Sequence, residues 1–243
     1  MRSIGIIGFG SFGQFMVSHL KPFFDVFVTD EVNLQKDAEQ LGVVWDSIEN
    51  IVTKDIVVFC VPVQYLESIL IKYGHNISPS ALVTDVSSVK VKPIELMKKY
   101  VPESTEIIGI HPLFGPQSGK NGIEGLNIVV CPARTNKPHL LNRFFRSVLK
   151  LNVMERTAEK HDKQMAYVQA LTHFVGRAVN EMDIPDVDQK TPAYQYLLDI
   201  KRNLGGDSYD LFLTIEKENP FAREVREEFI KELGSLNDEL NQN

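Results

Sequence analysis

Ile4-Gly5-Ile6-Ile7-Gly8-Phe9-Gly10-Ser11-Phe12-Gly13 is the stretch that decides the fold of this chain of 243 residues. Residues 4–7 predict a short buried strand, and the spacing of apolar residues over 15–20 predicts a helix. The intervening GxGxxG stands in the strand–turn–helix context that gives this motif its meaning. There Gly8 permits the turn, Gly10 lets the backbone approach a pyrophosphate, and Gly13 lets the helix pack on the strand. The helix N-terminus then directs free N–H groups at the phosphates.

A second predicted strand, residues 26–29, ends at Asp30. Asp30 follows the motif by about 20 residues, the spacing typical of dinucleotide-binding folds. An acid there accepts hydrogen bonds from the ribose hydroxyls of NAD and repels the 2′-phosphate of NADP. The following Glu31, Val32 and Asn33 include no arginine that could hold such a phosphate. The sequence therefore predicts NAD as the cofactor.

Predicted strands and helices continue to alternate up to residue 155, which is typical of an α/β fold with a doubly wound, Rossmann-type parallel sheet. The predicted strands cover 55–61, 82–85, 106–110, 127–131 and 151–155, and the helices 65–73, 93–100 and 138–150. Ligands of such sheets bind beyond the carboxyl ends of the strands, where Gly10, Pro62, Ser88 and His111 fall. The candidate cofactor site comprises Gly8, Phe9, Gly10, Ser11, Phe12, Gly13, Asp30, Val61, Pro62 and Ser87.

The apolar run 107–110 ends in His111, and the sequence Pro112-Leu113-Phe114-Gly115-Pro116 then constrains the backbone. Histidine is the side chain whose ordinary pKa lets it accept a proton near neutral pH. A loop that presents a histidine at a strand end is therefore a candidate general base. Taken alone, His111 could equally be a residue that satisfies a turn; the cofactor motif upstream favours the catalytic role.

From Thr157 onward the strand patterns stop and amphipathic helices take over, so we place a domain boundary between 1–156 and 157–243. Thr157 is predicted to cap a helix that carries an apolar face from Met165 to Val179. Further helices are predicted over 192–203, over 208–218 and from Pro220, with Asn219 as the N-cap. A helical domain of this size commonly needs a partner surface to complete its core, so we predict a homodimer.

The net charge of -6 gives no general attraction to nucleic acid or to anionic membranes. Cys60 and Cys131 both lie in apolar runs, and no cysteine and histidine cluster has metal-ligand spacing. We expect buried free thiols, a cytoplasmic protein and no metal site. The chain enters its first strand at once, so we expect neither a signal peptide nor a membrane span. A plastid location would require that a transit peptide had been removed.

The chain resembles the prephenate/arogenate dehydrogenase family over nearly its whole length. The matching pieces are GFGSFG at 8–13, DVSSVK at 85–90, HPLFGPQSGKNG at 111–122, QALTHFVGR at 169–177 and TPAYQYLL…GDSYDLF at 191–212. HPLFGP is the most specific of them, and the GKNG and GDS pieces are closest to the plant-like arogenate branch. We expect no fused regulatory or mutase segment.

The resemblance implies an NAD-dependent oxidative decarboxylation in tyrosine biosynthesis, from arogenate to tyrosine or from prephenate to 4-hydroxyphenylpyruvate. Hydride leaves C4 for the nicotinamide, the C4 hydroxyl loses its proton, and the ring carboxylate departs as carbon dioxide. By resemblance, His111 takes that proton and Ser88 orients the histidine, the hydroxyl or the nicotinamide. The alternative role for Ser88 is a helix N-cap, and the two roles are compatible.

The resemblance also implies a substrate pocket lined by His173. Cationic side chains must reach the substrate carboxylates, and the candidates are Arg177, Arg202 and Lys120. Gln117 lies in the matching loop, and Asp188 matches an acidic position of the arogenate branch, where a carboxylate would pair with the substrate ammonium. The prephenate branch has an arginine in a later helix, where this chain reads Leu213-Thr214-Ile215-Glu216-Lys217. Which arginine binds the ring carboxylate therefore stays open, and Arg202 could equally be a solvated charge. Arogenate is the predicted substrate.

Two other classes of protein fit parts of this pattern. A β-hydroxyacid or imine reductase would put a lysine or a Ser/Thr pair on the second-domain helix, where this chain has Leu171-Thr172-His173-Phe174. A regulator that binds NAD without catalysis would have no use for His111 and Ser88. An activity assay separates these classes.

Overall fold

The computed structural model describes residues 2–135, 137–204 and 208–242. It divides the chain into two compact units, Met1–His161 and Asp162–Asn243, here called the N-terminal unit and the C-terminal unit. The boundary predicted after residue 156 precedes α7 (Ala158–Met165), whereas the observed division falls inside that helix. Gly206 and Asp207 of the GDS piece lie outside the described residues.

The N-terminal unit contains an eight-stranded sheet with the order β3-β2-β1-β4-β5-β6-β7-β8. Its strands are β1 (Ser3–Ile7), β2 (Asp25–Thr29), β3 (Val44–Trp45), β4 (Ile56–Phe59), β5 (Leu82–Asp85), β6 (Glu106–Pro112), β7 (Asn127–Arg134) and β8 (Asn152–Glu155). Six neighbouring pairs are parallel, which confirms the predicted Rossmann-type sheet. The pair β6–β7 is antiparallel, because the loop 113–126 joins these strands without a crossover helix.

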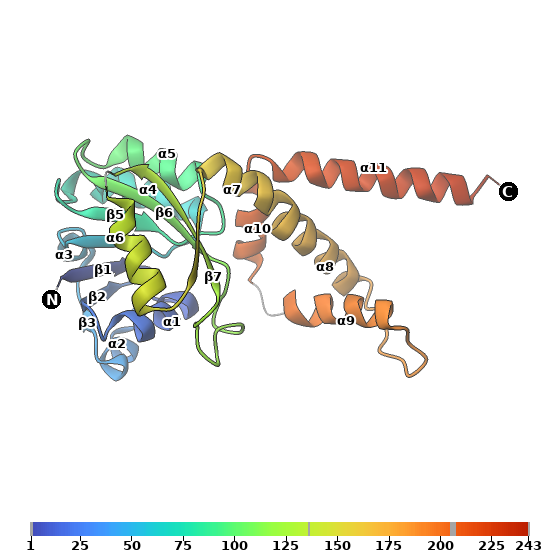
Figure 1. Ribbon diagram of the computed structural model, residues 1–243, viewed down its shortest axis with the longest axis horizontal. Helices are drawn as coiled ribbons and strands as arrows, with labels where there is room; N and C mark the ends of the chain where they lie inside the picture. The colour runs from blue at the N-terminus through green and yellow to red at the C-terminus, as the bar shows by residue number, and fades with distance from the viewer. Residues whose placement is uncertain (1, 136, 205–207, 243) are drawn as a thin grey trace. The chain divides into compact units, whose positions relative to one another are not determined.

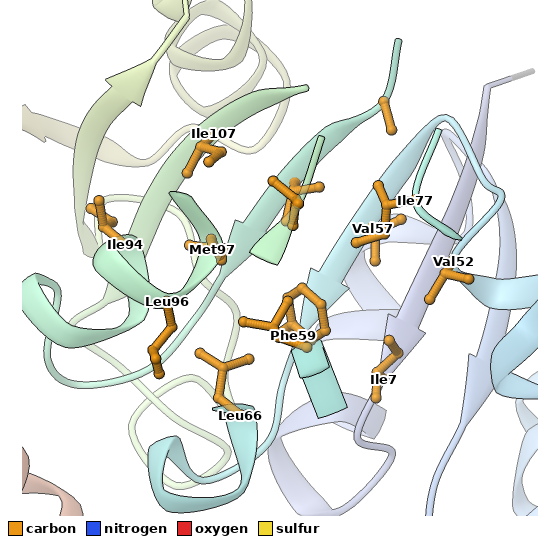
Figure 2. Close-up of a cluster of buried hydrophobic side chains, with 14 of the residues drawn as sticks. Ile7, Val52, Val57, Phe59, Leu66, Ile77, Ile94, Leu96, Met97 and Ile107 are labelled. Atoms are coloured by element: carbon orange, nitrogen blue, oxygen red, sulfur yellow. The ribbon is translucent and has the colours of Figure 1, made fainter. Parts of the chain in front are cut away.

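The helices of this unit are α1 (Ser11–Leu20), α2 (Gln35–Leu41), α3 (Ile48–Ile51), α4 (Val63–Tyr73), α5 (Val91–Tyr100) and α6 (Pro138–Arg143). A 3₁₀ turn, η1 (Gly74–Asn76), follows α4, and a π-helical turn, η2 (Phe144–Val148), follows α6. Helices α4 and α5 lie side by side (Figure 1). Figure 2 shows that Leu66 of α4 and Met97 of α5 pack with Phe59 of β4.

Successive residues of the central strands enter different cores. In β4, Val57 and Phe59 pack under α4 and α5, whereas Ile56 and Val58 join the core that includes Val17 of α1. Alternate strand residues point to opposite faces of a sheet, so both faces of β4 are buried. The uninterrupted apolar sequence of this strand is the expected signature of a strand covered on both faces.

Three neighbouring strands, β1, β4 and β5, end in one row across the sheet, and β6 continues from that row to Pro112. Ile7 of β1 pairs with Phe59 of β4, Phe59 with Asp85 of β5, and Asp85 with Gly109 of β6. The chain moves from β1 to β2 on one side and continues with β4 on the other, which makes this row the topological switch point. The strand ends that we predicted to meet are therefore neighbours.

The C-terminal unit, as far as it is described, is built from helices: the end of α7, the π-helical η3 (Ala166–Leu171), α8 (Thr172–Glu181), α9 (Pro192–Leu204), α10 (Tyr209–Glu218) and α11 (Ala222–Leu240). The predicted Thr157 cap is confirmed, because its hydroxyl accepts a hydrogen bond from Lys160 N at 3.2 Å. The predicted Asn219 cap is wrong. Asn219 Oδ1 accepts from Phe221 N at 2.9 Å in a turn, and α11 begins only after Phe221.

Among the described residues of the C-terminal unit, few large side chains are fully covered. Its buried apolar cluster consists of Ala170, Ile215 and Ala222. Tyr196 is 69% exposed and Leu240 is 76% exposed. Over the described ranges, none of the helices combines the length and the apolar character needed to cross a membrane.

Candidate active site

The glycine turn after β1 has two tightly packed glycines and one that faces open space. Gly8 has φ +103°, and a Cβ there would stand 2.3 Å from the carbonyl oxygen of Cys60. A Cβ on Gly13 would stand 2.3 Å from the carbonyl oxygen of Gly8. A Cβ on Gly10 would meet nothing within 4 Å. Gly8 and Gly13 thus serve the packing of the turn, and Gly10 leaves room beside the start of α1.

The surroundings of this turn suit a phosphate and a ribose. Helix α1 starts at Ser11, and its N-cap Gly10 supplies no side-chain acceptor to the first-turn N–H groups. Asp30, at the end of β2, accepts hydrogen bonds from Phe9 N at 2.6 Å and from Val32 N at 3.1 Å. A carboxylate has about four lone-pair sites, so two acceptor sites remain after these bonds.

The end of β4 closes the same region. Cys60 N donates to the carbonyl of Ile7 at 2.7 Å, Val61 is half-buried, and Pro62 is the N-cap of α4. Burial, with a smaller contribution from Asp30, raises the pKa of the Cys60 thiol to about 12. This thiol is therefore protonated at neutral pH.

His111 lies inside β6 and not in a loop, which corrects the sequence-based interpretation. It pairs with Val129 of β7, because the ladder continues through Pro112. The His111 side chain is 4% exposed, and its Nδ1 lies 2.8 Å from Nε2 of His161 in α7. The two rings meet edge to face with centroids 5.0 Å apart, and His161 is 1% exposed.

The pKa of His111 is held well below its usual value of 6.5. Burial is the largest cause, followed by the repulsion of His161 and of Lys90 on a protonated ring. His111 is therefore neutral at neutral pH and able to accept a proton.

A buried ion pair joins Lys90 to Asp85, the last residue of β5. Lys90 is fully buried, and Asp85 is 1% exposed. The pair lies on the α5 side of β6, because a Cβ on Gly109 would stand 3.0 Å from Lys90 Cδ. Gly109 and His111 are two residues apart in the strand, so they face the same side. This arrangement places a fixed positive charge next to the histidine.

The turn that follows β5 carries both predicted serines. Ser87 N donates to Asp85 Oδ2 at 3.1 Å, and the Ser87 hydroxyl binds the same oxygen. Ser87, which we expected to bind the cofactor, thus holds the Asp85 carboxylate. Ser88 is half-buried in this turn. It is not the N-cap of α5, because that position is occupied by Lys90.

The predicted substrate residues lie in both units. Gln117 and Lys120 are exposed in the β6–β7 loop of the N-terminal unit, and His173 is half-buried in α8. Asp188 is exposed between α8 and α9, and Arg202 is 73% exposed and pairs with Asp199 of its own helix at 2.5 Å. Arg202 thus has the surroundings of a solvated charge.

Arg177 is the candidate arginine whose side chain is held in place. Its guanidinium carbon lies 4.8 Å from the ring centroid of Tyr209 and 5.0 Å from that of Phe212. Where the prephenate branch would have its arginine, Glu216 is 7% exposed and pairs with Arg226 of α11.

Sequence reasoning did not identify the roles of His161, Lys90 and Asp85. Lys90 and Asp85 belong to the DVSSVK piece, so that motif could have pointed to them. No local pattern marks His161, which reaches His111 only through the tertiary fold. Within the described ranges, no group of three or more His, Cys, Asp and Glu side chains could hold a metal ion.

Comparison with known proteins gives matches over both units. Residues 21–154 match a family model described as prephenate dehydrogenase, nucleotide-binding domain, and residues 178–243 match a TYRAAT1-like C-terminal domain. Arogenate dehydrogenase 2, chloroplastic, of Arabidopsis thaliana is 30% identical over 98% of this chain and 69% of its own length. Arogenate dehydrogenase 1, chloroplastic, of the same plant is also 30% identical, over 98% of this chain and 39% of its own length.

A structural neighbour agrees in fold. A crystal structure of prephenate dehydrogenase from A. aeolicus in complex with hydroxyphenyl propionate and NAD+ superposes with a TM-score of 0.78 at 21% identity. The match covers 100% of this chain and 91% of that one.

Proposed function

The chain belongs to the prephenate dehydrogenase family, and on that premise we propose that it catalyses the NAD-dependent oxidative decarboxylation of a cyclohexadienyl substrate. The observation that carries the proposal is the buried, neutral His111 at the carboxyl end of β6, in the same unit as the glycine turn. Ligands of open α/β sheets bind at this edge.

In the proposed reaction, His111 accepts the proton of the C4 hydroxyl at Nε2, because its Nδ1 is occupied by His161. The bond from the ring to its carboxylate carbon breaks, its electron pair moves into the ring as carbon dioxide leaves, and the ring becomes aromatic. The oxygen on C4 then takes the proton back from His111 and becomes the hydroxyl of the product. NAD, when bound, supplies the acceptor for the hydride that leaves C4. Ser88 remains the candidate for orienting the C4 hydroxyl, since it lies in the turn after the neighbouring strand β5.

The residues around the glycine turn fit NAD. The open space at Gly10 and the start of α1 suit the pyrophosphate, and Asp30 suits the adenosine ribose. Two adjacent acids, Asp30 and Glu31, would repel a 2′-phosphate. Wild type is expected to prefer NAD over NADP, and Asp30→Ser combined with Glu31→Arg is expected to move the preference toward NADP.

Arogenate is the proposed substrate. Arg177 is our candidate for a substrate carboxylate, since stacking on Tyr209 and Phe212 engages the face of the guanidinium and leaves its N–H edge for a planar anion. Asp188 is the candidate partner of the substrate ammonium. Because Asp188 is exposed, its contribution depends on being covered by the bound substrate. An unchanged ratio of kcat/KM for the two substrates in Asp188→Asn would remove it from substrate selection.

The decisive experiment supplies the protein with arogenate or prephenate and with NAD or NADP, and measures the absorbance of the reduced nicotinamide. Turnover is expected, and His111→Asn should lower kcat by roughly 10²–10⁴-fold, the range for losing a positioned base. NAD affinity should be unchanged in this variant. Absence of turnover with every pair would contradict the proposal, and NAD binding without turnover would favour a regulator.

We also propose that the protein works in the cytoplasm as a homodimer through its C-terminal unit. The support for the dimer is the exposure of large apolar side chains in that unit, including Tyr196 and Leu240.

A further inference from the structure

We propose that His161 is a positioning residue for the base: it fixes the tautomer and orientation of His111. This inference rests on the proposed function, since it concerns how that function's base is prepared. It assigns a role to a buried histidine that would otherwise be a passive packing residue.

The contact between the rings dictates where the protons stand. Two neutral imidazoles 2.8 Å apart need one N–H donor and one acceptor. If His111 is to accept a substrate proton at Nε2, its own proton must be on Nδ1, so Nδ1 donates to Nε2 of His161. His161 then carries its proton on Nδ1. The opposite assignment, with His161 as the donor, would put the His111 proton on Nε2 and remove its capacity as a base.

A neutral acceptor suits this site better than a carboxylate. A carboxylate next to Nδ1 would favour the imidazolium and raise the pKa of His111. The groups shown to contact His111 or to act on its charge are His161 on α7, Val129 on β7 and Lys90 at the start of α5, whose charge is paired with Asp85 of β5. None of these attracts a proton to His111 as a bare carboxylate would, so the ring is oriented while it stays neutral.

The first experiment compares His161→Leu, which removes the acceptor, with His161→Gln, whose amide oxygen can accept the same bond. His161→Leu is expected to lower kcat about 10- to 100-fold, less than the loss of the base itself. The KM values for substrate and NAD should change by less than about twofold. His161→Gln should retain most of the wild-type kcat, whereas a packing role would leave both variants similar.

A second variant tests the charge argument by its pH profile. His161→Glu places a carboxylate next to Nδ1, so the acid limb of kcat/KM should move to higher pH than in wild type. An acid limb that stays in place would show that position 161 does not act on the ring of His111.

A double-mutant cycle separates action through His111 from general damage. In a His111→Asn background, His161→Leu should cause no further loss of kcat, because its effect passes through the missing ring. The control is His19→Leu. His19 also meets an aromatic ring edge to face, Phe15 at 4.9 Å, but lies in the last turn of α1. It should leave kcat unchanged. Thermal melting and NAD titration check the folding of each variant.

A folded His161→Leu with wild-type kcat, or a loss that persists in full in the His111→Asn background, would overturn the role of His161 while leaving the proposed function intact. Absence of turnover in the wild type would overturn the proposed function itself. If His161→Leu does not fold, the pH profile of His161→Glu and the kcat of His161→Gln decide the question.

Discussion

At the scale of single residues, burial has two effects on the ability of His111 to act as a base. Burial keeps its ring free of bulk water, and burial also lowers its pKa well below 6.5. A weaker base accepts a proton less readily, but it remains available over a wider range of acidic pH. A weak base suits the proposed reaction, because the departure of carbon dioxide would make the overall step irreversible.

The pH profile of the wild type follows from this. Because the pKa of His111 is lowered, the fraction of neutral ring falls only at pH values below 6.5, and the acid limb of kcat/KM should lie there. The unfolded chain binds a proton at this histidine near pH 6.5 and the folded chain does not, so the same residue should destabilise the fold as pH falls through that value. Steady-state rates and thermal melts between pH 5 and about pH 8 measure both effects. An acid limb above 6.5 would contradict this assignment of the base.

Residue identities at the site could be predicted where a local motif demands them. The glycines of residues 8–13, Asp30 and His111 each stand at a strand end that the sequence reveals. The contact of His111 with His161 could not be predicted, because His161 lies fifty positions away along the chain. The two rings meet only after β6 and α7 are in place. The assignment of Ser87 to the cofactor stays a prediction, because a serine near a strand end can bind either a ligand or its own turn.

At the scale of elements, the turn between β1 and α1 offers a matched pair of substitutions. Gly8→Ala forces a Cβ into a φ of +103° and against the Cys60 carbonyl, so it should destabilise the N-terminal unit by more than about 1 kcal/mol. Gly10→Ala meets no neighbour, so its melting temperature should match the wild type.

The order should be reversed for cofactor binding: per folded molecule, Gly10→Ala should lose more NAD affinity than Gly8→Ala. The added methyl of Gly10→Ala points into the space assigned to the pyrophosphate, so NAD affinity should fall about tenfold or more. Calorimetry of melting and titration with NAD provide the two readouts. A Gly10→Ala protein that binds NAD as tightly as wild type would place the phosphates elsewhere.

Element prediction succeeded where the chain is strongly periodic and failed where tertiary contacts decide. The apolar runs of β1, β4 and β5 are explicit in the sequence. Strand β3 has two residues, too few for a pattern, and it exists because it pairs with β2 at the edge of the sheet. The antiparallel direction of β7 depends on the loop 113–126, and no pattern in the sequence of that loop predicts that the chain reverses its direction there. The π-helical η3 interrupts what reads as one continuous helix.

At the scale of the whole molecule, the C-terminal unit carries an exposed apolar stripe on α11, formed by Ile230, Leu233, Leu236 and Leu240. These residues are spaced three, three and four apart, so they follow one side of the helix. We expect Leu233→Lys to dissociate the proposed dimer, and Ser235→Lys, on the other side of the helix, to leave it intact. Sedimentation velocity over a concentration series measures this; a monomeric wild type would remove the dimer from the proposal.

The two cysteines of the chain lie in different parts of the sheet, Cys60 after β4 and Cys131 within β7. With a pKa of about 12, only roughly one Cys60 side chain in 10⁴ is a thiolate at pH 8, and Cys131 is fully buried. Alkylating reagents attack the thiolate, so neither cysteine should be modified while the sheet is intact. The rate of labelling would then measure how often the sheet opens transiently. Cys60 would report on opening of the parallel centre of the sheet, and Cys131 on opening of its antiparallel side. Saturating NAD should slow the labelling of Cys60 more than that of Cys131, because opening the cofactor turn would require the ligand to leave.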